Sequence, residues 1–239
     1  MDQFLPAIPL KGTRVIVIGD GEAARAKLRL FAGAPCELVW RPAVKSAALP
    51  GVDTETGARI VQGRFVPPGA FSGAKFVFIA LEDEARAARL AARARRAGAL
   101  VNVVDNLPLC DFYTPAIVDR GSVTIALSTG GAAPVLVRDI RSALEGLVAP
   151  GVGLLARSAN ALRDTVRETL PALDARRRFW EAALRGEAAA RADAGDGPGT
   201  ARALSHALAR FRDGRAEPGK VFLVGAGPGD PELLTLKAV

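Results

Sequence analysis

Asp105 is the residue best placed for acid–base chemistry, because it directly follows the apolar run Leu100 to Val104. In open α/β sheets, ligands bind at the carboxyl ends of the strands, and a carboxylate there can accept a proton during an oxidation. Aspartate at a strand end also commonly caps a turn, so position alone leaves both roles open. The one histidine, His206, lies in an Ala/Arg-rich segment typical of a surface helix. We therefore expect the general base to be Asp105.

A glycine turn near the N-terminus has the spacing of a dinucleotide-binding site. The apolar run Val15 to Ile18 leads into Gly19-Asp20-Gly21-Glu22-Ala23-Ala24, a G-x-G-x-x-A sequence. The first glycine permits the tight turn, the second lets the backbone approach a pyrophosphate, and free N–H groups of the following helix face the phosphates. The motif predicts nucleotide binding, although a purely structural turn can have the same sequence.

Arg41 replaces an acid that many such sites contain. That acid binds the adenosine ribose and lies about 20 residues beyond the glycine turn, where this chain has Trp40-Arg41-Pro42. Arg41 is either a solvated strand end or a partner for the 2′-phosphate of NADP. The preference between NAD and NADP therefore stays open.

The segment Leu127 to Ala132 is a third candidate, because it leads from a predicted strand into a predicted helix. The hydroxyls of Ser128 and Thr129 and the free N–H of Gly130 can hold a carboxylate or phosphate, helped by the helix dipole. Basic side chains nearby would form a rim for an acidic substrate: Arg120, Arg138 and Arg141. Helix capping with solvated arginines is the alternative.

These residues require an α/β scaffold. From Thr13 to Asp105, short β-branched runs alternate with Ala/Arg/Leu stretches of helical period, which predicts βαβ units and a doubly wound parallel sheet. The expected strands are Arg14 to Ile18, Glu37 to Trp40, Arg59 to Gln62, Phe76 to Ala80 and Leu100 to Val104. The expected helices are Glu22 to Ala32 and Glu82 to Ala97.

The alternation of predicted strands and helices ends after Asp105. Strands are expected over Phe112 to Val118 and Ser122 to Leu127, with an amphipathic helix over Ala132 to Leu147. This small α+β unit has too little core to stand alone, so we expect it to pair with a second copy in a homodimer.

The C-terminal part is predicted to be largely helical. Helix is expected over Gly153 to Arg185 and Ala201 to Arg212, with a mobile connector over Ala188 to Gly199. A further strand, Val221 to Val224, begins a new unit that the chain does not complete. The predicted domains are a nucleotide-binding domain (1–112), a dimerisation region (113–149), a helical domain (150–214), and a linker with the start of another domain (215–239).

Composition narrows the class of protein. A net charge of +7 suits nucleic acid, an anionic membrane surface or a small polyanionic substrate. Aromatic residues make up only 5% of the chain, and no stacking motif of RNA-binding sheets occurs, so nucleic acid is disfavoured. No apolar run approaches the roughly 20 residues of a membrane helix, and the N-terminus does not resemble a secretory signal. We expect a cytoplasmic protein with two reduced, structural cysteines, Cys36 and Cys110, and no bound metal.

Several ordered segments together resemble the bacterial siroheme synthases, whose N-terminal half is a precorrin-2 dehydrogenase and sirohydrochlorin ferrochelatase. They are Val17 to Gly21 with Ala24 and Lys27, Asn102 to Asp105, Ser128 to Gly131 with Pro134 to Leu136, Arg176 to Glu181, and Val224 to Pro231 with Leu233 to Lys237. The last is similar to the opening of tetrapyrrole methyltransferases that use S-adenosylmethionine. The resemblance implies that the chain ends inside such a domain of a longer protein, which would also methylate uroporphyrinogen III.

The resemblance also implies roles for individual residues. Asp105 matches the catalytic aspartate, Asn102 lies at the same substrate-facing strand end, and Pro228 matches a contact to S-adenosylmethionine. The implied NAD contacts are Gly19, Gly21, Glu22, Ala23, Ala43 and Val44. Asp20 departs from the family's glycine-only turn, so its carboxylate must face away from a bound pyrophosphate.

The implied reactions are NAD-dependent oxidation of precorrin-2 to sirohydrochlorin and insertion of ferrous iron as a substrate, with iron against cobalt left open. Two rivals remain at this point. One is another nicotinamide-dependent oxidoreductase, and the other is a non-catalytic sensor that binds NAD through the same turn.

Overall fold

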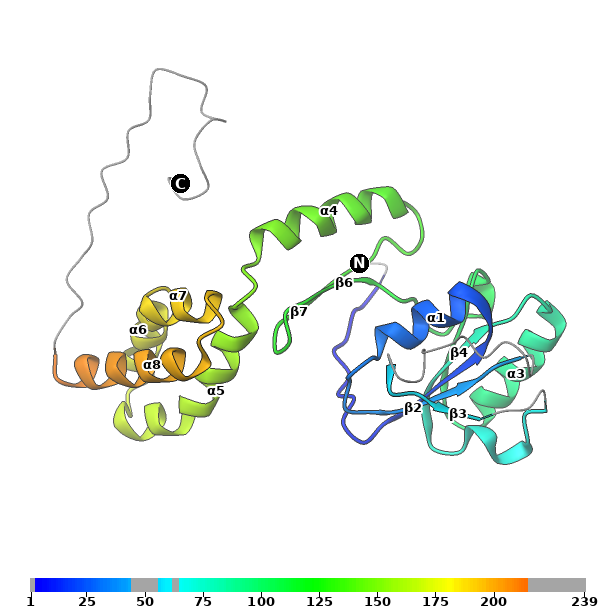
Figure 1. Ribbon diagram of the computed structural model, residues 1–239, viewed down its shortest axis with the longest axis horizontal. Coiled ribbons are helices and arrows are strands. Elements are labelled where there is room, and N and C mark those ends of the chain that lie inside the picture. The colour runs from blue at the N-terminus through cyan, green and yellow to red at the C-terminus, as the bar shows by residue number, and fades with distance from the viewer. Residues whose placement is uncertain (1–2, 44–55, 62–64, 215–239) are drawn as a thin grey trace, which may run out of the picture. The chain divides into compact units, whose positions relative to one another are not determined.

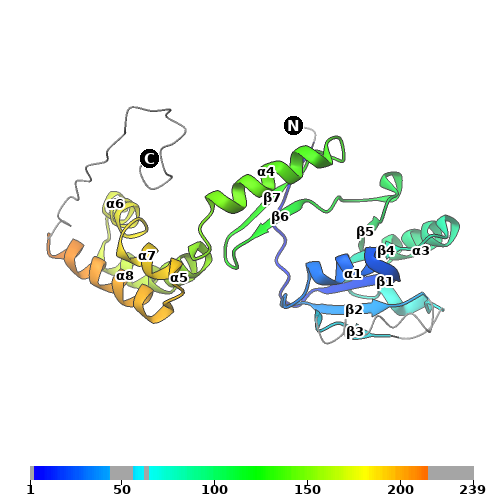
Figure 2. The ribbon, with the colours of Figure 1, turned by 45° about the horizontal axis from the view of Figure 1, so that its top comes forward.

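Five parallel strands form the central sheet of the N-terminal unit (Figure 1), in the order β3-β2-β1-β4-β5, and Figure 2 labels all five. The computed structural model describes residues 3–43, 56–61 and 65–214. The strands are β1 (Arg14–Gly19), β2 (Glu37–Arg41), β3 (Arg59–Ile60), β4 (Ala74–Ala80) and β5 (Leu100–Val103). This order confirms the predicted doubly wound fold. The strand bounds agree with the predicted ones to within two residues, except that Gln62, the predicted end of the third strand, lies outside the described residues.

Both faces of the sheet are buried, because successive residues of a strand point to opposite sides. Val15 and Val17 pack with Leu28 of helix α1 (Gly21–Leu30) on one face. Ile16 and Ile18 pack with helix α3 (Glu84–Arg96) on the other face. The two helices lie beside the sheet in Figures 1 and 2. A 3₁₀ turn, η1 (Pro68–Phe71), precedes β4.

After β5 the chain forms the 3₁₀ turn η2 (Leu107–Leu109) and then a two-stranded sheet of β6 (Ala116–Asp119) and β7 (Thr124–Leu127). Arg120 N donates to Val123 O at 2.9 Å and closes the loop between these two strands. The first strand begins four residues later than predicted. Its predicted first residue, Phe112, instead packs edge-on against Phe76 and Phe78 of β4.

Helix α4 (Pro134–Leu147) confirms the helix predicted over Ala132 to Leu147. It begins at a proline, which is favoured in the first turn because its missing N–H would be unpaired there anyway. The helix is amphipathic, yet none of its residues is buried. Its exposed large apolar side chains are Val135, Leu136, Ile140 and Leu147.

The chain divides into two compact units: residues 1–117 with 126–141, and residues 118–125 with 142–239. In the second unit, four helices surround one core: α5 (Val152–Thr169), α6 (Leu173–Ala183), α7 (Glu187–Asp193) and α8 (Gly197–Arg212) (Figure 2). Phe179 and Leu204 are almost fully buried in this core. The predicted helical character of this part is confirmed.

The predicted mobile connector over Ala188 to Gly199 is wrong. This stretch forms α7 and the first turn of α8. Ala188 and Ala192 are buried in the helical core, and Asp196 caps α8 by accepting a hydrogen bond from Gly199 N at 2.8 Å. The small side chains that suggested a linker instead permit close helix packing.

His206 lies exposed on α8, as predicted. The predicted strand Val221 to Val224 lies outside the described residues. No helix in the part of the chain that the structure describes is long and apolar enough to cross a membrane.

Candidate functional site

A cavity of about 330 Å³ opens at the carboxyl end of β5, within the N-terminal unit. This volume falls at the lower end of the range typical of ligand sites. Its walls come from α1, the turn after β5, the segment that leads into β6, and the loop between β7 and α4. The polar side chains that line it are Lys27, Asn102, Asp105, Cys110, Tyr113, Thr114, Ser128 and Thr129.

Asp105 lies at the mouth of this cavity in a strained backbone conformation. With a φ of 58°, it is the one non-glycine residue of the described ranges with positive φ. Aspartate tolerates this left-handed region better than most residues, but the conformation still costs about 1–2 kcal/mol. The side chain is exposed, and its carboxylate accepts no hydrogen bond from any described residue. Asp105 therefore does not cap the turn, and its oxygens remain available to a ligand.

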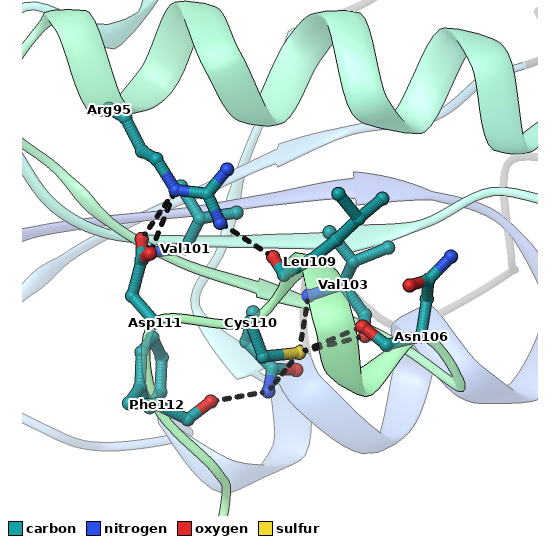
Figure 3. Close-up of polar contacts among 9 residues, drawn as sticks. Arg95, Val101, Val103, Asn106, Leu109, Cys110, Asp111 and Phe112 are labelled. Carbon is teal, nitrogen blue, oxygen red and sulfur yellow. Dashed lines mark hydrogen bonds and ion pairs between the residues drawn. The ribbon is translucent and has the colours of Figure 1, made fainter.

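A hydrogen-bonded network behind the turn holds this conformation (Figure 3). The thiol of Cys110 accepts from Val103 N at 3.3 Å and can donate to Val103 O at 3.2 Å or Asn106 O at 3.3 Å. Asn102, which is buried, donates from Nδ2 to Phe112 O at 2.9 Å. These bonds fasten both ends of the Asp105 turn to β5.

Arg95 of α3 fastens the same segment from its outer side (Figure 3). Its Nε lies 2.8 Å from Asp111 Oδ1, and its guanidinium also donates to Leu109 O at 2.7 Å. Asp111 Oδ2 in turn accepts from Val101 N at 2.9 Å. The turn that carries Asp105 is thus supported by a helix and a strand of the rigid sheet domain.

Lys27 is the cationic group of the cavity. It extends from α1, and its Nζ donates to Thr114 Oγ1 at 3.0 Å and lies 5.6 Å from the centre of the Phe78 ring. Burial lowers the pKa of Lys27, while the nearby Cys110 and Asp105 act in the opposite direction. Lys27 and Asp105 do not form an ion pair.

The loop between β7 and α4, residues 128–133, faces the same cavity and is called the Ser128 loop below. Ser128 Oγ donates to Gln3 Oε1 at 2.7 Å and accepts from Gly130 N at 3.1 Å. Thr129 Oγ1 accepts from Ala133 N at 3.2 Å, which caps the start of the following helix. Ser128 and Thr129 line the cavity, whereas Gly130 supports the loop from outside it.

The glycine turn has the geometry that a dinucleotide requires. Gly19 has φ +130°, and a Cβ built there would lie 1.9 Å from Ala80 O, so only glycine fits between β1 and β4. Gly21 has φ +71°, and its Cβ would meet nothing within 4 Å. The pyrophosphate of a dinucleotide can therefore approach the backbone of Gly21 and the first N–H groups of α1.

Asp20 points away from that approach. Its two carboxylate oxygens accept from Ala43 N at 3.0 and 3.1 Å, just beyond β2. This matches the expected outward orientation, and it gives Ala43 a structural role at the edge of the turn. Glu22 and Ala23 are exposed on α1, where Glu22 pairs with Arg29 at 3.1 Å.

Arg41 is half-buried at the end of β2, so it is not a fully solvated strand end. Its Nε is buried without a hydrogen-bond partner in the described residues. Burial lowers the pKa of Arg41, and the neighbouring Arg59 lowers it further. The Arg59 guanidinium itself pairs with Glu37, at the start of β2, at 2.9 Å.

Three predicted substrate contacts do not line the cavity: Gly130, as described above, Arg120 and Arg138. Arg120 belongs to the second unit, where its guanidinium donates to Glu145 O and Val148 O at 3.0 and 3.2 Å and so caps the end of α4. Arg138 is exposed and lies 3.4 Å from Asp139. The predicted contacts Val44 and Pro228 lie outside the described residues.

Sequence reasoning did not include Lys27, Cys110 or Thr114 among the site residues: Lys27 was named only for the family resemblance, and Cys110 only as a structural thiol. Lys27 follows the glycine turn by six residues, and its spacing from the buried Ala24 and Leu28 places it on the sheet-facing side of α1. That spacing could have predicted from the sequence that Lys27 lies on this side of α1. No group of three or more metal-binding side chains is gathered within the described ranges.

Comparison with known proteins agrees with this geometry. Residues 7–116 match a family model described as putative NAD(P)-binding, and residues 151–208 match one described as the sirohaem synthase dimerisation region. A siroheme synthase of Methylococcus capsulatus is 40% identical over 240 residues, covering 100% of this chain and 50% of that protein. A siroheme synthase of Chromobacterium violaceum is 36% identical over 238 residues, covering 99% of this chain and 50% of that protein.

The chain is therefore similar to siroheme synthases along its whole length. It spans about half the length of the curated siroheme synthases it matches. Its fold is similar to that of a solved structure, SirC, precorrin-2 dehydrogenase, with a TM-score of 0.69 and 17% identity over 88% of this chain and 100% of that one. The matched dimerisation region lies C-terminal to residues 113–149, and the assignment of dimer contacts to 113–149 stays a prediction.

Proposed function

We propose that this chain oxidises precorrin-2 to sirohydrochlorin with NAD and then inserts ferrous iron to give siroheme. The observation that carries the proposal is the cavity at the end of β5. It brings the free carboxylate of Asp105 together with the Ser128 loop, in the same unit as a turn shaped for a dinucleotide. Relatives named siroheme synthase, 36–40% identical over at least 99% of the chain, support it.

The glycine turn would hold the pyrophosphate of NAD on the backbone at Gly21 and on the first N–H groups of α1. Bound oxidised nicotinamide would accept a hydride from the substrate. Asp105 takes the proton that leaves with the hydride, because it is the one carboxylate among the described residues that line the cavity.

The same carboxylate serves the second reaction. Two pyrrole N–H protons leave when ferrous iron enters the macrocycle as substrate, and Asp105 assists their removal. The hydroxyls of Ser128 and Thr129, which line the cavity, bind a substrate carboxylate, and Gly130 supports the loop through its N–H bond to Ser128 Oγ. Arg138 contributes positive charge outside the cavity. The second unit's Arg120 would contact substrate only by giving up its hydrogen bonds to α4.

We propose further that the chain functions as a homodimer. The match to a dimerisation region supports this, and so does the apolar face of α4, which no described part of the chain buries. Large exposed apolar faces commonly mark contacts between proteins. The longer proteins of the family suggest an additional methyltransferase activity that uses S-adenosylmethionine, with Pro228 as a contact. The cytoplasmic location remains a prediction from the sequence.

The test is the Asp105→Asn variant, assayed for NADH formation and for the chlorin absorbance of the product. We expect kcat to fall by about 10²–10⁴-fold, the range for loss of a general base. Asparagine also tolerates positive φ, so the turn keeps its conformation. Glu84→Gln, an exposed change in the first turn of α3, is the matched control and should retain full activity.

Normal rates of both oxidation and iron insertion in Asp105→Asn would refute the assignment of the base. If the unaltered protein binds NAD but does not turn over precorrin-2, it is a sensor. If it instead oxidises a different small acid, it is another nicotinamide-dependent oxidoreductase.

A further inference from the structure

Lys27 is a half-buried cation that the proposed mechanism does not use. Among the described residues that line the cavity, it is the one basic side chain, opposite the one carboxylate. An ammonium group has three N–H donors, and Thr114 Oγ1 takes one of them at 3.0 Å. No carboxylate of the described residues lies within ion-pair distance of it, so its charge is not neutralised by the protein.

Keeping a lysine in this position has a cost. Removing an ammonium from water is unfavourable unless an anion or several acceptors compensate. The ring of Phe78 offers partial compensation through its π face at 5.6 Å. The remaining charge faces a cavity that is otherwise lined by hydroxyls, an amide, a thiol and apolar side chains, with Asp105 as its one carboxylate. Because Asp105 forms no ion pair with Lys27, the ammonium can bind an anionic group of a ligand.

The cofactor phosphates are poorly placed to be that anion. They are expected at Gly21, where α1 begins, whereas Lys27 lies six residues further along the helix. At a rise of 1.5 Å per residue this is about 9 Å from the start of α1. The cavity side of Lys27 is instead shared with Asp105 and the Ser128 loop.

We propose that Lys27 binds a carboxylate of the acidic tetrapyrrole and thereby holds the macrocycle in the cavity that contains Asp105. The inference rests on the proposed function and adds a specificity-determining residue to it. Thr114 holds the ammonium in place, so the bond is preorganised and costs little side-chain entropy on binding.

The experiment compares Lys27→Met, Lys27→Arg and Lys75→Met in the full chain. Methionine keeps the length of the side chain without its charge, arginine keeps the charge, and Lys75 is an exposed lysine on β4 that serves as the control. The measurements are KM and kcat for precorrin-2, Kd for sirohydrochlorin by fluorescence without NAD or iron, and Kd for NAD.

For Lys27→Met we expect KM and the sirohydrochlorin Kd to rise about tenfold or more, the effect of losing one charged hydrogen bond. The expected kcat stays within about twofold of wild type, because the lost interaction stabilises the bound substrate and the transition state equally. The affinity for NAD should stay unchanged. Lys27→Arg should recover most of the sirohydrochlorin affinity, and Lys75→Met should behave as wild type.

Binding should also depend on pH. The ammonium binds only when protonated, and its pKa is lowered, so affinity should fall with rising pH earlier than for an ordinary lysine. Asp105, Cys110 and Tyr113 also face this cavity, so the Lys27→Arg variant separates their titration from that of Lys27. In Lys27→Arg this alkaline loss should move to higher pH.

An unchanged sirohydrochlorin Kd in Lys27→Met would overturn the inference. So would a loss of NAD affinity, which would assign Lys27 to the cofactor, or a fall in kcat alone, which would assign it to proton transfer. If the wild-type protein binds sirohydrochlorin through Lys27 but never oxidises precorrin-2, the proposed function fails while the inference about Lys27 stands.

Discussion

Replacing Gly19 by alanine should destabilise the sheet domain far more than the same change at Gly21. A Cβ at Gly19 would lie 1.9 Å from Ala80 O, whereas real Cβ atoms essentially never approach within 3.0 Å. The neighbour is backbone of β4, so β1 and β4 must separate by about 1 Å, which stretches ladder hydrogen bonds beyond their useful range.

The magnitude follows from two costs. The φ of +130° at Gly19 is strongly disfavoured for alanine and costs about 1–3 kcal/mol. Two weakened backbone hydrogen bonds add about 1 kcal/mol each. We expect Gly19→Ala to lower the free energy of unfolding by about 3–5 kcal/mol. At Gly21 the space is open, so only the left-handed φ contributes, about 1–2 kcal/mol.

The assay is urea unfolding followed by tryptophan fluorescence. The chain has two tryptophans. Trp40 is fully buried beside the turn, with its Nε1 donating to Gly19 O at 2.9 Å, and Trp180 belongs to the helical unit. In a Trp180→Phe background, the signal reports the sheet domain alone.

NAD binding separates the two glycines further. Gly21→Ala should fold but lose most of its NAD affinity, because its Cβ occupies the space that the pyrophosphate needs. The steric argument would be refuted if the free energy of unfolding of Gly19→Ala lay within about 1 kcal/mol of the wild-type value, which is on the order of the error of such measurements.

Three other predictions concern separate parts of the chain. Cys110→Ala should lower kcat severalfold and the free energy of unfolding by about 1–2 kcal/mol, because Val103 N loses its hydrogen-bond partner. Cys36→Ala, the control, should leave kcat unchanged. If both variants lower kcat equally, the network around Cys110 does not support the Asp105 turn. Leu136→Glu should convert the dimer to a monomer in light scattering if α4 forms the contact, whereas dissociation only by Leu173→Glu would assign the contact to the matched dimerisation region. Arg41→Ala should reduce kcat/KM with NADP about tenfold relative to NAD, and a wild-type protein that already rejects NADP would remove this role for Arg41.

The sheet could be predicted from the sequence because its strands are buried on both faces. Runs such as Val15 to Ile18 are apolar throughout, and the helices between them keep a clear period. The cavity could be predicted in part, because Asp105 and Ser128 both follow strands, and strand ends gather ligand-binding loops.

The remaining features depend on tertiary contacts that the sequence pattern does not contain. Lys27 enters the cavity because of the rotation of α1 on the sheet, and Cys110 faces it because the chain after Asp105 folds back on β5. Arg120 looks like a substrate contact in sequence, but it caps a helix because α4 ends beside it. The Ala-rich stretch beginning at Ala188 forms a helix because the core of the helical unit buries its alanines.

The left-handed backbone at Asp105 also restricts how this acid can be redesigned. Only glycine, asparagine and aspartate adopt such a conformation readily, so exchange for glutamate adds strain at the same time as it lengthens the side chain. The acid is thus limited to a single methylene between backbone and carboxylate. An engineer who wishes to shift its reach into the cavity must first change the path of the chain after β5, not the residue itself.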